Sequence, residues 1–227
     1  MKPWIRVDGS QAPDGTTIEL YQRDAEFSLR ADGRVLMGSR TQGSEVQLAE
    51  LAIAAMPGIQ KPQILVGGLG FGYTLRAVLE HAPAAATVHV IELMPSVIAF
   101  NQGVLGPLAD FPLKDSRVRV TKGDVVQHLK STRERYDAIL MDVDNGPQSF
   151  TQASNEWLYR QVGLVRIRKV LNPGGILSVW SVGQDDAFTG QLQASGFDVE
   201  CHRVRARANG KGERHAIWVA RPTASGG

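Results

Sequence analysis

Three glycines at alternate positions follow a short apolar segment and precede a predicted helix. The segment Ile64-Leu65-Val66 leads into Gly68-x-Gly70-x-Gly72, and the spacing that follows predicts a helix over 73–81. Glycines at this point let the backbone approach a ligand closely, and a helix start presents unpaired N–H groups. A dinucleotide loop would need glycine at Tyr73, and no nucleoside-triphosphate loop is present. The loop therefore predicts close contact with a different ligand, unless it only packs the helix on the strand.

Acidic residues end the next two predicted strands. Glu92 closes the strand over 87–91, 20 residues after Gly72, and Asp124 with Val125 follows the strand over 117–120. In a doubly wound sheet these positions border the ligand crevice. Glu92 can accept hydrogen bonds from both hydroxyls of a ribose, and Asp124 can accept from an adenine amino group. Each acid can instead cap the helix that follows it.

A further pair of carboxylates, Asp142 and Asp144, follows the predicted strand over 136–141. Residues at alternate positions just past a parallel strand lie at the mouth of the sheet, so this pair is a candidate for the reacting centre. Asn145-Gly146-Pro147 comes next and predicts a turn. The alternative is that both acids serve only that turn.

Two regions must position these residues. In residues 1–61, alternating apolar and polar residues predict strands over 17–22, 26–30 and 34–37, and a helix over 45–56 capped by Ser44. Residues 62–222 alternate strands and helices, and 223–227 form a tail. The strands are predicted at 64–66, 87–91, 117–120, 136–141, 176–180, 197–202 and 216–220, and the further helices at 95–102, 124–130, 156–170 and 186–195.

Continuous apolar strands that alternate with amphipathic helices indicate an α/β fold. Such a pattern is typical of a parallel sheet with helices on both faces, here with an antiparallel edge formed by the last two strands. Asn172-Pro173-Gly174-Gly175 predicts a tight turn before the strand over 176–180. The fold class is thus Rossmann-like, with a small N-terminal β extension.

Composition excludes several classes of protein. With 43% hydrophobic and 21% charged residues the chain is neither disordered nor a coiled coil, and a net charge of +2 indicates no nucleic-acid or membrane partner. One cysteine, Cys201, and five histidines without ligand spacing predict no metal site. The N-terminus lacks the apolar core of a secretion signal, no apolar segment is long enough to cross a bilayer, and we expect a soluble, cytoplasmic protein.

The segment 203–214 is locally basic. It holds five basic residues and one acid, and Arg203, Arg205 and Arg207 alternate along one face of the strand. The ordinary interpretation is a solvated edge whose charges prevent aggregation. An acidic acceptor or a nucleic acid is the other interpretation, but no aromatic residue supplies a stacking platform, which argues against single-stranded nucleic acid.

Together these motifs resemble a known family. The glycine loop, the strand ending in Glu92, Gly123-Asp124 and Tyr136-Asp137-Ala138-Ile139-Leu140-Met141-Asp142 are similar to the class I S-adenosylmethionine-binding fold, and more narrowly to spermidine synthases and their relatives. The resemblance covers roughly residues 30–183. It implies a seven-stranded sheet, a nucleoside over the strand ends, and an N-terminal β element that lids the site. It is also compatible with a homodimer.

The sequence departs from the family on the side of the acceptor. The family's glycine loop carries an aspartate where this chain has Phe71, its Tyr-His-Glu step reads Leu48-Ala49-Glu50 here, and Trp180 replaces a polar residue. The aspartate-rich loop is shortened to Asp142-Val143-Asp144. We therefore predict an intact cofactor half, formed by Gly68, Gly70, Gly72, Glu92, Asp124 and Val125, and an altered acceptor side, formed by Glu45, Gln47, Glu50, Phe71 and Trp180.

Three functions remain open at this stage. The first is an enzyme that transfers methyl from S-adenosylmethionine to a small polar or amine acceptor, because Phe71 and Trp180 form an apolar wall. The second is aminopropyl transfer from decarboxylated S-adenosylmethionine to a diamine, because Asp142, Asp144, Glu45 and Glu50 can surround a cation. In both, Asp142 accepts a proton from the amine or orients it. The third is a nucleoside-binding protein without catalysis.

Overall fold

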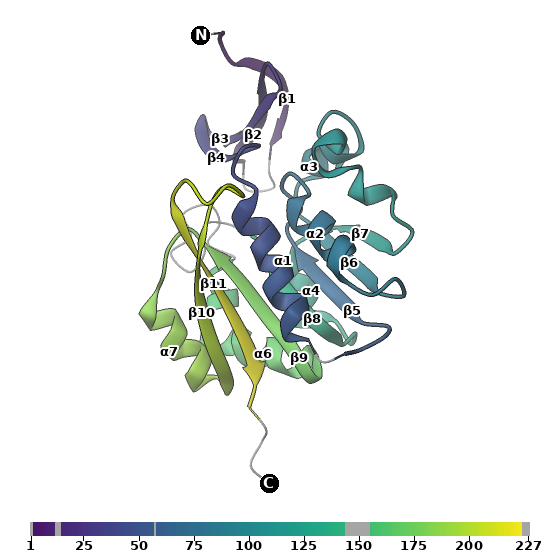
Figure 1. Cartoon of the computed structure of the whole chain (residues 1–227), viewed down its shortest axis with the longest axis vertical. Helices are drawn as coiled ribbons and strands as arrows, with labels where there is room; N and C mark the ends of the chain where they lie inside the picture. Colours follow the sequence, from purple (N-terminus) through teal and green to yellow (C-terminus); the bar gives the residue numbers. More distant parts are fainter. Residues whose placement is uncertain (1, 12–14, 57, 144–154, 224–227) are drawn as a thin grey trace.

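The computed structural model describes residues 2–11, 15–56, 58–143 and 155–223, and it contains two sheets (Figure 1). The smaller is antiparallel, in the order β1-β2-β3-β4. It is built from β1 (Ile5–Gln11), β2 (Thr17–Arg23), β3 (Glu26–Ala31) and β4 (Arg34–Gly38). The three predicted strands of this region are present, and β1 is an additional strand. Ile5-Arg6-Val7-Asp8 alternates apolar and polar residues over only four positions, and most of the β1 side chains are exposed.

The larger sheet has the order β10-β11-β9-β8-β5-β6-β7. Its strands are β5 (Gln63–Gly67), β6 (Thr87–Glu92), β7 (Val118–Lys122), β8 (Tyr136–Met141), β9 (Leu171–Ser181), β10 (Phe197–Arg205) and β11 (Arg214–Pro222). β5 to β9 are parallel, and β11 pairs antiparallel with both β9 and β10. The strand order reverses between β5 and β8, which opens a crevice at their carboxyl ends. The Rossmann-like fold with an N-terminal antiparallel sheet is therefore confirmed.

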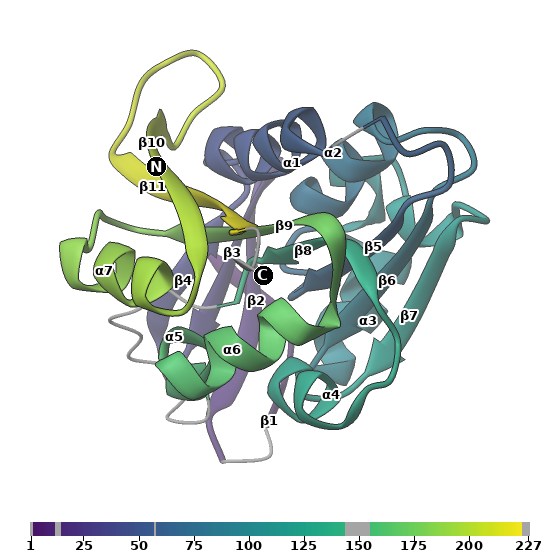
Figure 2. The same cartoon turned by 90° about the horizontal axis from the view of Figure 1, so that it is seen from below.

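Helices cover both faces of this sheet (Figure 2). Alternate residues of each strand face opposite sides: Ile64 and Val66 pack on one side, and Leu65 packs on the other. The first side is covered by α1 (Gly43–Ala55), α2 (Tyr73–His81) and α3 (Pro95–Gln102), and the second by α4 (Val125–Ser131), α5 (Glu156–Tyr159), α6 (Gln161–Val170) and α7 (Asp186–Ala194). In the described part of the chain, no helix has the length and apolar composition needed to cross a membrane.

Three local predictions were wrong. The helix predicted over 156–170 is broken at Arg160, which is extended (φ −87°, ψ 155°), and the chain turns so tightly that a Cβ on Gly163 would lie 1.9 Å from the Trp157 carbonyl oxygen. The segment predicted as a turn at 172–175 lies inside β9, where the pairing with β8 shifts register. Ser44 does not cap α1, because the helix begins one residue earlier, at Gly43.

Candidate active site

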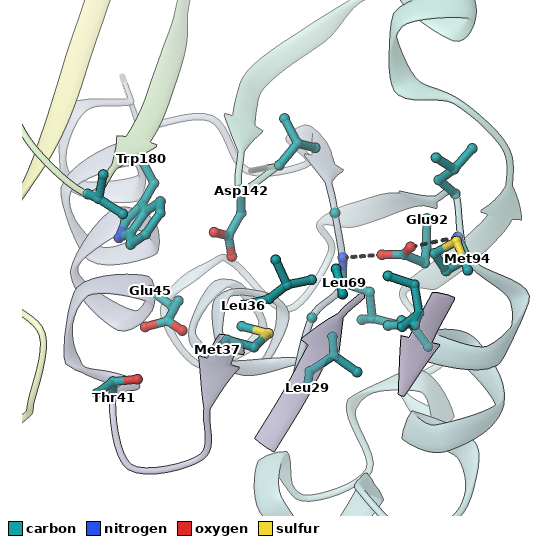
Figure 3. Close-up of a pocket in the computed structure, with 18 of the residues that line it drawn as sticks. Leu29, Leu36, Met37, Thr41, Glu45, Leu69, Glu92, Met94, Asp142 and Trp180 are labelled. Carbon is teal, nitrogen blue, oxygen red and sulfur yellow. Dashed lines mark hydrogen bonds between the residues drawn. The ribbon is translucent and has the colours of Figure 1, made fainter. Parts of the chain in front are cut away.

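A cavity of about 650 Å³ lies between the small sheet and the carboxyl ends of the large one (Figure 3). The small sheet and the segment after it contribute apolar side chains to one wall, including Leu29, Leu36 and Met37. The opposite wall is formed by the ends of β5, β6, β8 and β9, and the β10–β11 hairpin closes one side. The crevice between β5 and β8, predicted to hold the ligand, thus opens into this enclosed space.

The glycine loop lies on the floor of the cavity, where its backbone is held close to β8. Gly68 has φ +89°, and a Cβ on it would lie 2.2 Å from the carbonyl oxygen of Asp142. Gly70 (φ +51°) also lines the cavity. Gly72 does not, although its φ of +82° and its contact with Asn101 equally require glycine just before α2. Gly68 and Gly70 therefore shape the cavity itself, and Gly72 orients the helix behind it.

The Glu92 carboxylate joins the glycine loop to the start of α3. One oxygen accepts a hydrogen bond from the Leu69 N–H at 2.8 Å, and the other accepts from the Met94 N–H at 2.7 Å. Burial raises the pKa of Glu92, while these backbone donors act in the opposite direction. The Leu93 N–H also acts on this carboxylate, and a carboxylate offers about four acceptor positions, so at least one remains for a ribose hydroxyl. Holding the helix start and binding a sugar are therefore compatible roles.

Asp124 and Val125 lie at the next strand end, after β7. Both residues line the cavity, and the Asp124 carboxylate accepts a hydrogen bond from the Val126 N–H at 2.7 Å. Asp124 is thus the N-cap of α4, as one of its two predicted interpretations requires. The residue also lines the cavity, so it can serve both as a cap and in recognition of a base.

Two carboxyl groups from distant segments face the same part of the cavity (Figure 3). Asp142, after β8, accepts a hydrogen bond from the Thr74 hydroxyl at 2.6 Å, and Glu45 lies in the first turn of α1 with 6% of its surface exposed. Burial and the charge of Asp142 raise the pKa of Glu45 to about 8. Burial also raises the pKa of Asp142 to about 6. Near neutral pH the pair therefore holds one proton and one negative charge.

The predicted acceptor side is only partly brought together. Glu45 and Trp180 line the cavity, but Gln47 and Glu50 are not among the described residues that do so. Gln47 instead donates a hydrogen bond to Glu50, which lies 3.5 Å from His81. Gln47 and Glu50 therefore do not line this cavity, and a role for them on the acceptor side stays a prediction.

Phe71 was also misplaced by the sequence analysis, which put it on an apolar wall of the site. Its side chain is 1% exposed and packs in the core beside Tyr73, with ring centroids 6.1 Å apart. The aromatic wall therefore consists of Trp180. Asp144 lies outside the described residues.

Sequence reasoning missed a second wall, which the C-terminal hairpin contributes. Arg207, Glu213 and His215 line the cavity, and the Ala206 carbonyl accepts a hydrogen bond from the Gly43 N–H at 2.8 Å. His215 packs edge-on against Trp180, with ring centroids 4.8 Å apart. A basic segment distant in sequence gave no signal that it would meet α1.

A histidine cluster forms on the α4 side of the sheet, although the sequence showed no ligand spacing. Ligand atoms of His89, His128 and Glu134 lie within 4.8 Å of one another. The Arg119 guanidinium bonds both His89 and Glu134, and the Tyr136 hydroxyl lies 2.7 Å from His128 Nε2. Arg119 thus occupies the ligand atoms of His89 and Glu134, and Tyr136 occupies that of His128.

This cluster predicts acid-sensitive stability. Burial, assisted by the charge of Arg119, lowers the pKa of His89 to about 4, so the native state leaves it neutral while the unfolded state protonates near pH 6.5. The contribution of His89 to the free energy of unfolding is fully present above pH 6.5 and is lost as the pH falls toward 4. Urea unfolding at pH 7.5, 6 and 5 should show a shallower pH dependence for His89→Gln than for the parent.

The exposed residue His81 provides the control for this measurement. His81→Gln should keep the parent's pH dependence of the free energy of unfolding. If the free energy of unfolding depended on pH equally in His89→Gln and the parent, the folded cluster would not favour neutral His89 over protonated His89.

A switch-point cavity with a glycine floor and an acid at each neighbouring strand end is the arrangement expected of a Rossmann-like fold that binds a nucleoside. Residues 47–204 match the model of the spermine/spermidine synthase domain, and the chain belongs to this family.

Relatives and solved structures agree with this assignment. The chain is 29% identical over 126 residues to the polyamine aminopropyltransferase of Korarchaeum cryptofilum, covering 55% of this chain and 37% of that protein. It is 30% identical over 165 residues to polyamine aminopropyltransferase 1 of Streptomyces coelicolor, and this alignment covers 70% of this chain and 30% of that protein. The chain thus spans about a third of the length of these relatives. Its fold is similar to spermidine synthase from Thermotoga maritima (TM-score 0.74, 15% identity, 95% of this chain and 72% of that one).

Proposed function

We propose that this protein transfers the aminopropyl group of decarboxylated S-adenosylmethionine to a small amine. The observation that carries the proposal is the pair Glu45 and Asp142, two buried carboxyl groups that face one cavity beside the glycine loop. A cationic amine acceptor is attracted to such a pair, and the names of the curated relatives favour aminopropyl transfer over methyl transfer.

In this reaction a neutral amine attacks the aminopropyl carbon bonded to sulfur. The new N–C bond forms as the C–S bond breaks, and its electron pair returns to sulfur, leaving 5′-methylthioadenosine. An amine with a pKa near 10.4 needs about 4–5 kcal/mol to expose its lone pair at pH 7. Asp142 accepts this proton, and its raised pKa brings it closer to that of the amine than an ordinary aspartate would be.

The remaining cavity residues hold the donor. Glu92 accepts from the ribose hydroxyls, Asp124 and Val125 meet the base, and Gly68 with Gly70 lets the backbone lie against the nucleoside. The apolar side chains of Leu36 and Met37 cover the site and exclude water. Positioning of this kind can lower a barrier by about 7–11 kcal/mol.

The choice of donor tests the proposal. The protein is incubated with putrescine and either decarboxylated S-adenosylmethionine or S-adenosylmethionine, and products are followed by chromatography. We expect spermidine and 5′-methylthioadenosine with the first donor only. S-adenosylhomocysteine from the second donor would establish methyl transfer instead, for which the lack of an aspartate at Phe71 is the supporting observation. Calorimetric binding of the donors without any product would indicate a nucleoside-binding protein.

A further inference from the structure

Aminopropyl transfer leaves one proton behind in the cavity. The acceptor enters as an ammonium ion, and the product also leaves as an ammonium ion, while the positive charge of the sulfonium disappears. One proton must therefore reach solvent in each turnover. Asp142 and Glu45 can hold it only briefly, because a protonated pair cannot accept the proton of the next amine.

A line of hydrogen bonds leads from this pair to the edge of the hairpin. The Ser44 hydroxyl donates a hydrogen bond to Glu45 Oε2 at 3.2 Å, and His215 Nδ1 lies 2.8 Å from the same hydroxyl. Ser44 is completely buried, whereas His215 is partly exposed. Among the described residues, the other ring nitrogen of His215 has no hydrogen-bond partner.

We propose that Ser44 and His215 form the exit path of this proton, an inference that rests on the proposed transferase function. The Ser44 hydroxyl turns from Glu45 to His215 Nδ1, protonated Glu45 donates to the Ser44 oxygen, Ser44 passes its own hydrogen to His215 Nδ1, and the ring releases the hydrogen on Nε2 to water. The ionised Glu45 then takes up the proton that Asp142 removed from the amine, so one proton enters and one leaves. Reorientation of the hydroxyl and the ring restores the starting state.

The surroundings of His215 suit this role. Trp180, from β9, holds the ring edge-on at 4.8 Å, and Val204 is its neutral partner on β10. The charged groups that face it are Glu45, through Ser44, and Glu213 beside it on the hairpin. Burial lowers the pKa of His215, and Glu213 acts against this. The ring is therefore neutral at pH 7 and free to accept a proton.

The first test compares three variants in steady-state assays. His215→Ala should lower kcat about 10- to 100-fold with little change in the KM of the donor, and free imidazole should restore much of the loss. His215→Asn can still bond the Ser44 hydroxyl but cannot relay a proton, so it should be as slow as His215→Ala. His202→Gln, on β10, is the control and should match the parent enzyme.

The outcomes separate this inference from the proposed function. If the parent enzyme transfers aminopropyl groups and His215→Asn is equally active, the exit path is wrong while the function stands. A nitrogen-15 NMR measurement of the ring works without turnover. The Nε2–H tautomer at pH 7.5 supports the path, and the Nδ1–H tautomer overturns it whichever reaction the protein performs.

Discussion

Replacing Asp142 by asparagine is expected to lower turnover about 10²- to 10⁴-fold, the usual contribution of a positioned general base. The amide keeps the size of the side chain and still accepts the hydrogen bond that Thr74 donates at 2.6 Å. It cannot take the proton of the amine. Donor affinity, measured by calorimetry, should change only a few-fold, because Glu92 and the glycine loop are untouched.

The matched control for this variant lies on β8, the strand that Asp142 follows. Asp137 is buried and lies toward the other end of β8, where its carboxylate accepts hydrogen bonds from the Gln63 N–H and the Asn172 amide, each at 2.8 Å. Asp137→Asn should reduce stability without reducing turnover per folded molecule. A loss of turnover in Asp137→Asn as large as that in Asp142→Asn, or a fully active Asp142→Asn, would remove Asp142 from the mechanism.

Gly68→Ala should damage both folding and donor binding. A Cβ at this position would lie 2.2 Å from the Asp142 carbonyl oxygen, and the φ of +89° is one that alanine adopts only with strain. The loop must move, which disturbs the Leu69 N–H bond to Glu92. We expect a loss of at least about 2 kcal/mol in the free energy of unfolding and donor binding weakened more than tenfold.

Gly190→Ala is the control, because it makes the same substitution at a position where the structure leaves room for a Cβ. Gly190 lies in α7, a Cβ there meets nothing within 4 Å, and alanine favours a helix, so stability should stay equal or rise. Urea unfolding and calorimetric titration are run on both variants. If Gly68→Ala were as stable as its parent and bound the donor with the same affinity, the close approach of the loop to β8 would contribute neither to stability nor to donor binding.

The sequence predicted most of the large sheet because its signals are local. Strands β5 and β8 are continuous apolar segments buried on both faces, and α2 occupies the predicted residues 73–81 because Gly72 permits its start. An acidic residue also stands at or just after the end of each of three strands, and this pattern is visible in the sequence. This is why Glu92, Asp124 and Asp142 could be placed at the cavity before the structure was known.

The acceptor side could not be predicted in the same way. Glu45 and Glu50 are five residues apart on α1, so they project about 140° from each other, and only tertiary packing decides which faces the cavity. His215 meets Ser44 across 171 residues. No local pattern indicates such a contact, because it depends on where the hairpin lies against the helix.

The position of β11 has a consequence for how the chain acquires its function. It is the last described strand along the chain, yet it lies between β9 and β10 in the sheet. During synthesis on the ribosome, β10 therefore emerges before the strand with which it pairs. Until β11 follows, one edge of β9 also has no strand partner. The ends of β5, β6 and β8 can form their part of the cavity early, but His215, which contacts Ser44 of α1, arrives only when β11 is inserted. Insertion of β11 thus joins β9 to β10 and adds His215 to the cavity wall in the same step.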